Sequence, residues 1–98
     1  MAIKLDPVIH VVSRLRIMTV LSKIGTQEQL SFEKLRTMLG MTSGNLSVHL
    51  TKLEDAGYVT MFKTFERRKP VTYVSVTSQG QAAFQLYLTN LKELLGED

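Results

Sequence analysis

LSFEKLRTMLGMTSGNLSVHLTKLEDAG, residues 30–57, decides the fold because it has the pattern of two short helices separated by a turn. The first helix is expected from Ser31 to about Leu39, where apolar residues recur at the three- and four-residue steps of an amphipathic helix. Its apolar residues are Phe32, Leu35, Met38 and Leu39. Gly40 follows and is expected to end the helix as a C-terminal cap.

The second helix has an apolar side and a side of short residues. Thr42 or Ser43 supplies the oxygen for its N-terminal cap, which makes residues 31–56 a helix-turn-helix. The apolar stripe is Leu46, Leu50, Leu53 and Ala56. The opposite side carries Gly44, Asn45, Ser47, Val48, Thr51, Lys52 and Asp55. A helix in the major groove of DNA needs short side chains in its N-terminal turns, although an ordinary polar outer face explains the same pattern equally well.

Size and composition indicate one small globular domain spanning residues 1–98. Of the 98 residues 44% are hydrophobic, and no Pro- or Gly-rich tract marks a linker. The absence of cysteine excludes disulfides, thiolate metal sites and a cysteine nucleophile, and it agrees with a reducing compartment. Arginines interrupt the apolar N-terminal segment, unlike a signal peptide or membrane span. We therefore expect a cytoplasmic protein without membrane contact.

Positive charge is local rather than large. The net charge is +3, but residues 63–69 contain four cations against Glu66, and residues 1–24 contain four against Asp6. The chain after Ser78 is net acidic. This asymmetry fits phosphate contact from particular elements, although mild basicity is also common in proteins that never bind nucleic acid.

The residues before the helix-turn-helix predict further helical structure. Asp6 and Pro7 predict the start of a helix, with the aspartate as the N-terminal cap and the proline at the first helical position. Ser13 can cap a fresh start for a helix that ends at Gly25, before a loop and a short strand at residues 29–31. The buried stripe of this helix is Leu15, Met18, Leu21 and Ile24.

After Gly57 the period changes from that of a helix to that of a strand. YVTMFKTFE (58–66) and VTYVSVT (71–77) alternate and are rich in aromatic and β-branched residues, which predicts a hairpin over about 58–77. Its tip is ERRKP (66–70), with the proline expected outside the strand pairing. A ribbon of two strands is marginally stable alone, so one face must lie on the helices. Tyr58, Phe62 and Tyr73, or their strand neighbours, are expected to supply that face.

The C-terminal segment predicts an apolar helix over about 78–95. Ser78 and Gln81 have the spacing of a capping box. The apolar residues repeat as in a coiled coil, which favours packing against a second copy, although the helix could instead fold entirely onto its own domain. The expected homodimerisation residues are Ala83, Phe84, Tyr87, Leu88, Leu91, Leu94 and Leu95.

Three helices followed by a hairpin make a winged helix-turn-helix, and the chain resembles a group with that fold. RLRIM (14–18), SFEKLRTMLGMTSGNLSVHLTKLEDAGYV (31–59) and ERRKP followed by TYVSVTSQGQAAF (72–84) resemble the small transcriptional regulators related to the MarR and ArsR families. The most specific part is NLSVHLTKLEDAGYV (45–59). The resemblance implies an α+β, mainly helical fold that binds double-stranded DNA. It places residues 42–52 in the major groove and 67–69 on the backbone or minor groove.

The chain departs from these families in two ways. ArsR-type metal sensors carry cysteine or clustered histidine ligands, whereas this chain has only His10 and His49, so no metal site is expected. MarR proteins are longer, with extra helices that frame a ligand pocket at the dimer interface. We therefore expect no cofactor, and no small-molecule effector is evident.

The candidate DNA contacts differ in chemistry. Asn45 can make a bidentate contact with adenine, Ser43 and Ser47 can donate to phosphate or base, and Val48 can meet a thymine methyl. His49 fits a packed, helix-supporting position at least as well as a DNA contact. The tip cations can be solvated charges that discourage edge pairing, but beside such a helix contact with phosphate or the minor groove is favoured. The predicted DNA-binding residues are Thr42, Ser43, Gly44, Asn45, Ser47, Val48, Thr51, Lys52, Arg67, Arg68 and Lys69.

Catalysis has little support in the sequence. No His, Ser and acidic residues have a recognisable motif spacing, no Gly-rich phosphate loop follows a strand, and the adjacent acids Glu54 and Asp55 end a helix. The predicted function is a homodimeric, sequence-specific regulator of transcription that binds double-stranded DNA. The alternative is a winged helix used as a protein-interaction module without specific DNA binding.

Overall fold

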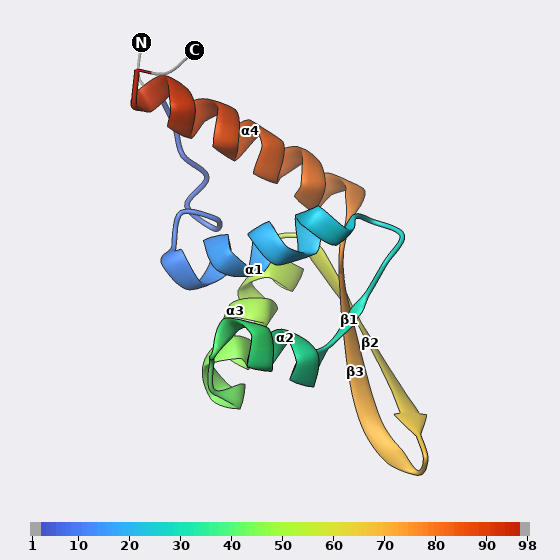
Figure 1. Ribbon diagram of the computed structural model, residues 1–98. Helices are drawn as coiled ribbons and strands as arrows, with labels where there is room; N and C mark the ends of the chain where they lie inside the picture. Colours follow the sequence, from blue (N-terminus) through green and yellow to red (C-terminus); the bar gives the residue numbers. More distant parts are fainter. Residues whose placement is uncertain (1–2, 97–98) are drawn as a thin grey trace.

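The computed structural model describes residues 3–96, which form four helices and a three-stranded antiparallel sheet (Figure 1). In chain order the elements are α1 (Val12–Ile24), β1 (Leu30–Ser31), α2 (Phe32–Leu39), α3 (Ser43–Asp55), β2 (Val59–Glu66), β3 (Lys69–Val76) and α4 (Ser78–Leu94). The α+β, mainly helical winged helix-turn-helix is confirmed. α2 and α3 form the helix-turn-helix, and β2 and β3 form the wing.

The sheet joins the wing to the helices. Its strand order is β1-β3-β2, with Leu30 opposite Val74 and Val59 opposite Val76. The strand predicted at residues 29–31 is thus present as β1. Because β1 covers only the base of β3, the rest of the wing is a two-stranded ribbon that projects beyond the helices (Figure 1). α4 lies along the opposite side of an elongated domain, whose extents are 54 × 25 × 21 Å.

One apolar core unites all four helices and the base of the wing. Its buried residues are Ile9, Ile17, Met18, Leu21, Leu35, Leu39, Leu46, Leu50, Leu53, Val59, Val74, Val76, Phe84 and Tyr87. Each fully buried leucine or isoleucine stabilises the fold by about 1.5–3 kcal/mol relative to an exposed one. The prediction for Met38 is wrong, since it is 52% exposed. It lies about a quarter turn around α2 from the line that Leu35 and Leu39 bury.

The helix-turn-helix has the predicted caps. The Ser31 hydroxyl accepts a hydrogen bond from the Lys34 N–H at 3.1 Å and so caps α2. Gly40 ends that helix in the left-handed conformation, with φ 63° and ψ 33°, which glycine adopts without a steric penalty. Thr42 caps α3 by accepting from the Asn45 N–H at 3.2 Å. Three local signals thus fix the angle at which α3 leaves α2.

The N-terminal segment makes a single turn instead of the helix predicted at Asp6. The Asp6 carbonyl accepts from the N–H groups of Ile9 and His10 at 3.1 and 2.8 Å, and Ile9 enters the core. α1 begins only at Val12, and no side chain caps it, so the cap predicted at Ser13 is wrong. The predicted end at Gly25 is confirmed.

The wing differs from the prediction at its tip. Only Arg67 and Arg68 form the turn, so Pro70 pairs with Phe65 inside the ladder, contrary to the prediction. Glu66 and Lys69, which flank the turn, form a hydrogen-bonded pair, so the next pair does not need the N–H that proline lacks.

The buried face of the wing consists of valines and a methionine, which are strand neighbours of the rings. Val59, Val74 and Val76 are buried and Met61 packs on the core, whereas Phe62 is 60% exposed. Of the two predicted alternatives, the strand neighbours supply this face and the ring of Phe62 does not. Alternation along β2 places Phe62 on the opposite face from Val59 and Met61.

α4 is anchored at its first turn and shares its apolar face with the core. Thr77, rather than the predicted Ser78, caps the helix by accepting from the Gly80 N–H at 2.9 Å. Phe84 and Tyr87 are 5% and 2% exposed, so the expectation that they face a second copy is wrong: both rings fill the domain's own core. Ala83, Leu88 and Leu91 pack partly against that core. Leu94 and Leu95 are exposed at 53% and 66%.

Candidate nucleic-acid interface

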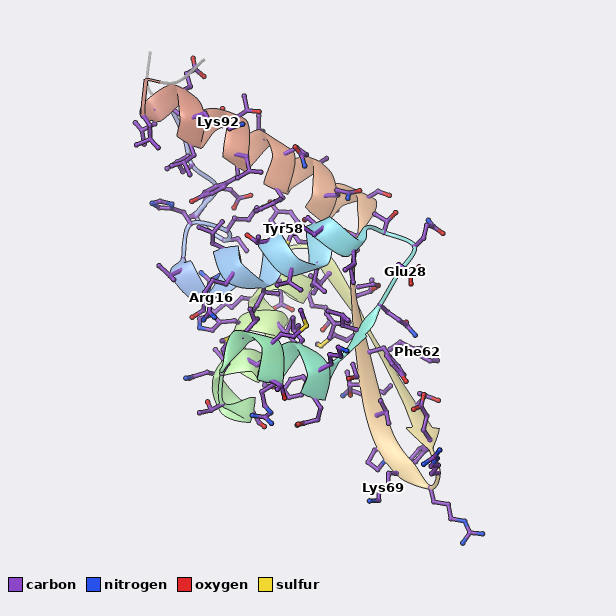
Figure 2. All side chains as sticks on the ribbon, in the orientation of Figure 1. Arg16, Glu28, Tyr58, Phe62, Lys69 and Lys92 are labelled. Atoms are coloured by element: carbon purple, nitrogen blue, oxygen red, sulfur yellow. The ribbon has the colours of Figure 1, made fainter. Side chains whose placement is uncertain are left out.

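The residues predicted to contact DNA lie on the surface of α3 and at the tip of the wing. Every one is exposed: Thr42, Ser43, Gly44, Asn45, Ser47, Val48, Thr51, Lys52, Arg67, Arg68 and Lys69. The first eight lie on the cap and outer side of α3, and the last three at and beside the turn between β2 and β3. Both groups lie on the side of the domain away from α4 (Figure 1). Figure 2 labels Lys69 at the tip of the wing.

The N-terminal turns of α3 present short side chains. Thr42 uses its hydroxyl as the cap, and the Thr51 hydroxyl donates to the Ser47 carbonyl at 3.0 Å, so both support the helix itself. A Cβ added to Gly44 would meet no atom within 4 Å, which shows open space in front of the backbone. The first turn carries no acidic residue. The helix dipole therefore keeps a positive end at this surface.

The turn of the wing holds two arginines in an unfavourable backbone conformation. Arg67 and Arg68 have φ angles of 52° and 66°, the left-handed region. A two-residue hairpin turn of this kind prefers Asn-Gly, because side chains other than glycine pay about 1–2 kcal/mol there. The backbone of this turn therefore does not favour arginine at either position. Their presence points to a role for the guanidinium groups themselves.

Within residues 3–96, no carboxylate forms an ion pair with the cations at the tip of the wing. Glu66 is the single acidic residue of the wing, residues 59–76, and its carboxylate accepts a hydrogen bond from the Tyr73 hydroxyl. That hydrogen bond raises the pKa of Tyr73. In the part of the chain that the structure describes, the one ion pair joins Arg36 to Glu33 at 3.0 Å within α2. The charges of Arg67 and Arg68 are therefore available to an external anion.

Arg36 of α2 supports the turn of the helix-turn-helix. Besides its ion pair with Glu33, its Nη1 donates to the Met41 carbonyl at 3.4 Å. The hydrogen bond and the charge of Glu33 raise the pKa of the Arg36 guanidinium. Its donors are thus directed at the protein.

Two arginines of α1, Arg14 and Arg16, hold the helix-turn-helix from behind. Arg16 donates to the Leu39 carbonyl at 2.8 Å and so satisfies the end of α2; Figure 2 shows Arg16 on the side of α1 that faces the helix-turn-helix. Arg14 lies 3.2 Å from Nδ1 of His49 and also donates to the Val8 carbonyl. These contacts join residues distant in sequence, and no local pattern signals them.

His49 belongs to the support of α3. Burial and the neighbouring charge of Arg14 lower the pKa of His49, in that order of importance. A neutral imidazole accepts a hydrogen bond from the guanidinium, which fixes the face that α3 turns outward. The expectation that His49 supports the helix therefore has a structural basis.

His10 makes a separate contact at the other side of the domain. Its Nδ1 lies 2.8 Å from the Tyr87 hydroxyl. Within residues 3–96 no group of three or more His, Asp or Glu side chains could hold a metal ion. None of the helices described is both long enough and apolar enough to span a bilayer.

α4 and the N-terminal segment form the surface at the opposite end. The Asn90 amide donates to the Lys4 carbonyl at 3.0 Å, and the Tyr58 hydroxyl donates to Asp6, which raises the pKa of Tyr58 to about 12. A cleft of about 600 Å³ lies between the segment and the helix. Its apolar rim includes Leu86, which is 60% exposed. The exposed leucines Leu94 and Leu95 lie farther along the chain, at the end of α4.

Comparison with known proteins agrees with this geometry. An uncharacterized protein of Methanocaldococcus jannaschii is 34% identical over 67 residues, which are 68% of this chain and 73% of that relative. A transcriptional regulator homologue of Pyrococcus horikoshii superposes with a TM-score of 0.81 at 29% identity, over 91% of this chain and 85% of its own.

A more distant structure shares the fold. A transcriptional regulator of M. tuberculosis, solved in complex with DNA, has a TM-score of 0.70 at 17% identity, over 92% of this chain and 62% of its own. The family model described as a winged helix DNA-binding domain matches residues 13–95, which include the helix-turn-helix, the wing and α4. The chain therefore belongs to the winged helix DNA-binding domain family.

Proposed function

We propose that the protein is a sequence-specific regulator of transcription that binds double-stranded DNA as a homodimer. The observation that carries this proposal is the presence of two surfaces on one side of the domain. They are the short, exposed first turns of α3 and a wing tip whose cations form no ion pair with any acid among the described residues. α3 fits the major groove, where short side chains let a helix approach base edges. The wing then reaches the adjacent backbone or minor groove.

Residues of α3 would carry the base preference. Asn45 has the donor and acceptor that pair with adenine, and it is exposed in the first turn. Ser43 and Ser47 would donate to phosphate or base, and Val48, 58% exposed, would contact a thymine methyl. Lys52, farther along the helix, would contact a phosphate.

Residues of the wing would carry affinity without sequence preference. Arg67, Arg68 and Lys69 would neutralise phosphates and release their counterions, which strengthens binding to every duplex. This division gives the two elements separate experimental signatures. Loss of a wing cation lowers the salt dependence of binding, whereas loss of a helix contact changes the preferred sequence.

The homodimer would form through α4. Leu94 and Leu95 are exposed, and Leu88 and Leu91 are only partly covered. Leu86 extends the apolar surface beyond the residues that the sequence pattern selected. A twofold axis through this surface would direct both copies of α3 to half-sites about one helical turn apart. The proposed dimer would bind DNA in this way without a cofactor or an effector.

The test is selection of binding sites from random duplexes by the intact protein, with its mass in solution measured by sedimentation. The expected products are two related half-sites and a dimer mass. Affinity should fall by about 0.9 log units per log unit of salt for each phosphate neutralised. A protein-interaction module would show no sequence enrichment and a weaker salt dependence.

A matched pair of variants tests the dimer surface separately. Leu94→Lys should shift the protein toward monomer, because it buries a charge in the proposed interface. Gln85→Lys adds the same charge to an exposed position of α4 without removing an apolar side chain and should leave the mass unchanged. Dimers of both variants would contradict an interface at the end of α4.

A further inference from the structure

Phe65 is a large apolar side chain at the tip of the wing that the domain leaves uncovered. It is 74% exposed and precedes Glu66, the last residue of β2. The cationic turn begins directly after Glu66.

Phe65 lies on the face of the ladder that packs on the helices at the base of the sheet. Because side chains alternate along a strand, Val59, Met61, Lys63 and Phe65 share one face of β2, and Val59 is buried. Phe62 lies on the other face, and Figure 2 shows it on the side of the wing away from α2. The two exposed rings of the wing thus have different surroundings.

Pro70 faces Phe65 across the ladder. The two residues are register partners at a non-hydrogen-bonded pair, where cross-strand side chains come closest. Proline fixes its own φ, and the two-residue turn fixes the end of the ribbon. Phe65 and Pro70 therefore form a small, preorganised apolar surface at the tip.

Positive charge adjoins this apolar surface along β2 and in the turn, whereas Glu33 and Glu66 line the cleft on the other side of Pro70. Lys63 shares its face, and Arg67 and Arg68 adjoin it in the turn. Glu66 points to the opposite face, where Tyr73 holds its carboxylate. A surface that is apolar at its centre and cationic at its edge complements the minor groove of duplex DNA, whose sugars lie between two rows of phosphates.

We propose that Phe65, backed by Pro70, enters the minor groove beside the site read by α3. Its ring contacts deoxyribose and base edges there, while Arg67 and Arg68 contact the phosphates on either side. The contact favours A·T pairs, because the amino group of guanine occupies the floor of the minor groove. This inference rests on the proposed function and adds a determinant of specificity to it.

The first experiment compares Phe65→Thr with Phe62→Thr on the duplex that the wild-type protein selects. Threonine, like phenylalanine, is favoured in strands, so both variants retain the propensity of β2. Phe65→Thr should weaken binding about tenfold, the effect of removing one apolar contact from the complex. The salt dependence should be unchanged because no charge is lost. Phe62→Thr, the matched control on the other face, should stay within about twofold of wild type.

The second experiment changes the DNA instead of the protein. A·T pairs outside the positions read by α3 are replaced by G·C or by inosine·C pairs, which lack the minor-groove amino group. The wild-type protein should bind the G·C duplex more weakly than the inosine·C duplex, and Phe65→Thr should lose this difference. The wild-type arm alone decides the minor-groove contact even where a variant fails to fold.

The outcomes separate this inference from the proposed function. A wild-type protein that binds no duplex overturns the proposed function. If the wild-type protein binds the duplex and Phe65→Thr binds it with the same affinity, only the inference about Phe65 is overturned. The inference also fails when Phe62→Thr loses as much affinity, or when Phe65→Thr changes the dimer mass, because the ring then acts in the fold or between copies.

Discussion

The two ends of the domain expose different surfaces around one core. At the helix-turn-helix end the candidate DNA contacts are mainly short, polar or cationic, such as Asn45 and Arg67, although Phe65 is 74% exposed at the tip of the wing. At the α4 end they include Leu86 and Leu94, which are 60% and 53% exposed. The wing tip and the end of α4 lie far apart along the long axis of the molecule (Figures 1 and 2).

The ends also differ in how the chain fixes them. α3 is held from behind by side chains, with Arg14 on His49 and Arg16 on the last carbonyl of α2. α4 is held by close backbone packing, with Gly80 against the carbonyl of Tyr58. The outer side chains of α3 therefore stay free for a ligand, whereas α4 buries part of its apolar face, Phe84 and Tyr87, in the core.

Alanine substitution of one glycine at each end should have opposite effects on stability. A Cβ on Gly80 would lie 2.1 Å from the Tyr58 carbonyl oxygen, so Gly80→Ala should lower the free energy of unfolding by about 3 kcal/mol. Gly44 has nothing within 4 Å of a Cβ, so Gly44→Ala should raise it by about 0.5 kcal/mol through helix propensity. Denaturant unfolding at fixed protein concentration measures both. Equal stability of the two variants would mean that α4 is not seated on that carbonyl.

The turn of the wing offers a variant that should gain stability and lose DNA affinity. Arg67→Asn with Arg68→Gly installs the preferred residues of the turn and removes left-handed strain, so the fold should gain about 1 kcal/mol. The same change removes two phosphate contacts. The slope of the logarithm of the binding constant against the logarithm of salt concentration should therefore decrease in magnitude by about 1.8. Titrations at several salt concentrations measure this. Arg67→Lys with Arg68→Lys, the control, keeps the charge and should keep most of the slope; unchanged slopes in both would place the DNA away from the wing.

The helix-turn-helix could be predicted closely because its determinants are local. Gly40 and Thr42 act on the residues beside them, and the leucine stripe of α3 has one interpretation. The wing was harder, because alternation defines two faces without saying which is buried. Both faces of β2 carry a phenylalanine, and the valines that enter the core are the less conspicuous residues. The tight turn was hidden because arginine is not expected at a positive φ.

The contacts that the sequence could not predict join distant residues. The sequence identified Phe84 and Tyr87 as apolar and helical, but the same stripe suits a twin or the domain's own core, and the answer depends on where α1 lies. Arg14 and Arg16 had the charge of solvated residues, yet their partners lie on α3 and α2. The predicted DNA contacts are all exposed, which is necessary for their role, and their part in binding stays a prediction.

Asn45→Ala should change sequence preference more than affinity. Loss of a bidentate contact should reduce discrimination at one base pair by about 1–3 kcal/mol, while binding to unselected DNA is unchanged. Competition with duplexes that differ at single positions measures this. Gln85→Ala removes an exposed amide at the α4 end and should leave every preference intact. A uniform loss across all duplexes would reassign Asn45 to a phosphate.

The smallest expected effect is a pH dependence of stability at the helix-turn-helix end. Burial and the charge of Arg14 lower the pKa of His49 in the folded protein below 6.5. When the pH falls below 6.5, the unfolded chain binds a proton at His49 more readily than the folded chain, so this residue's contribution to stability declines with acidification. His49→Gln keeps an acceptor for Arg14 without the titration. Denaturant unfolding between about pH 7.5 and 5.5 should show a steeper loss for the wild-type protein, since the carboxylates titrate alike in both. Parallel curves would mean that the Arg14–His49 contact does not hold α3 from behind, and the contrast between the two ends would then rest on their surfaces alone.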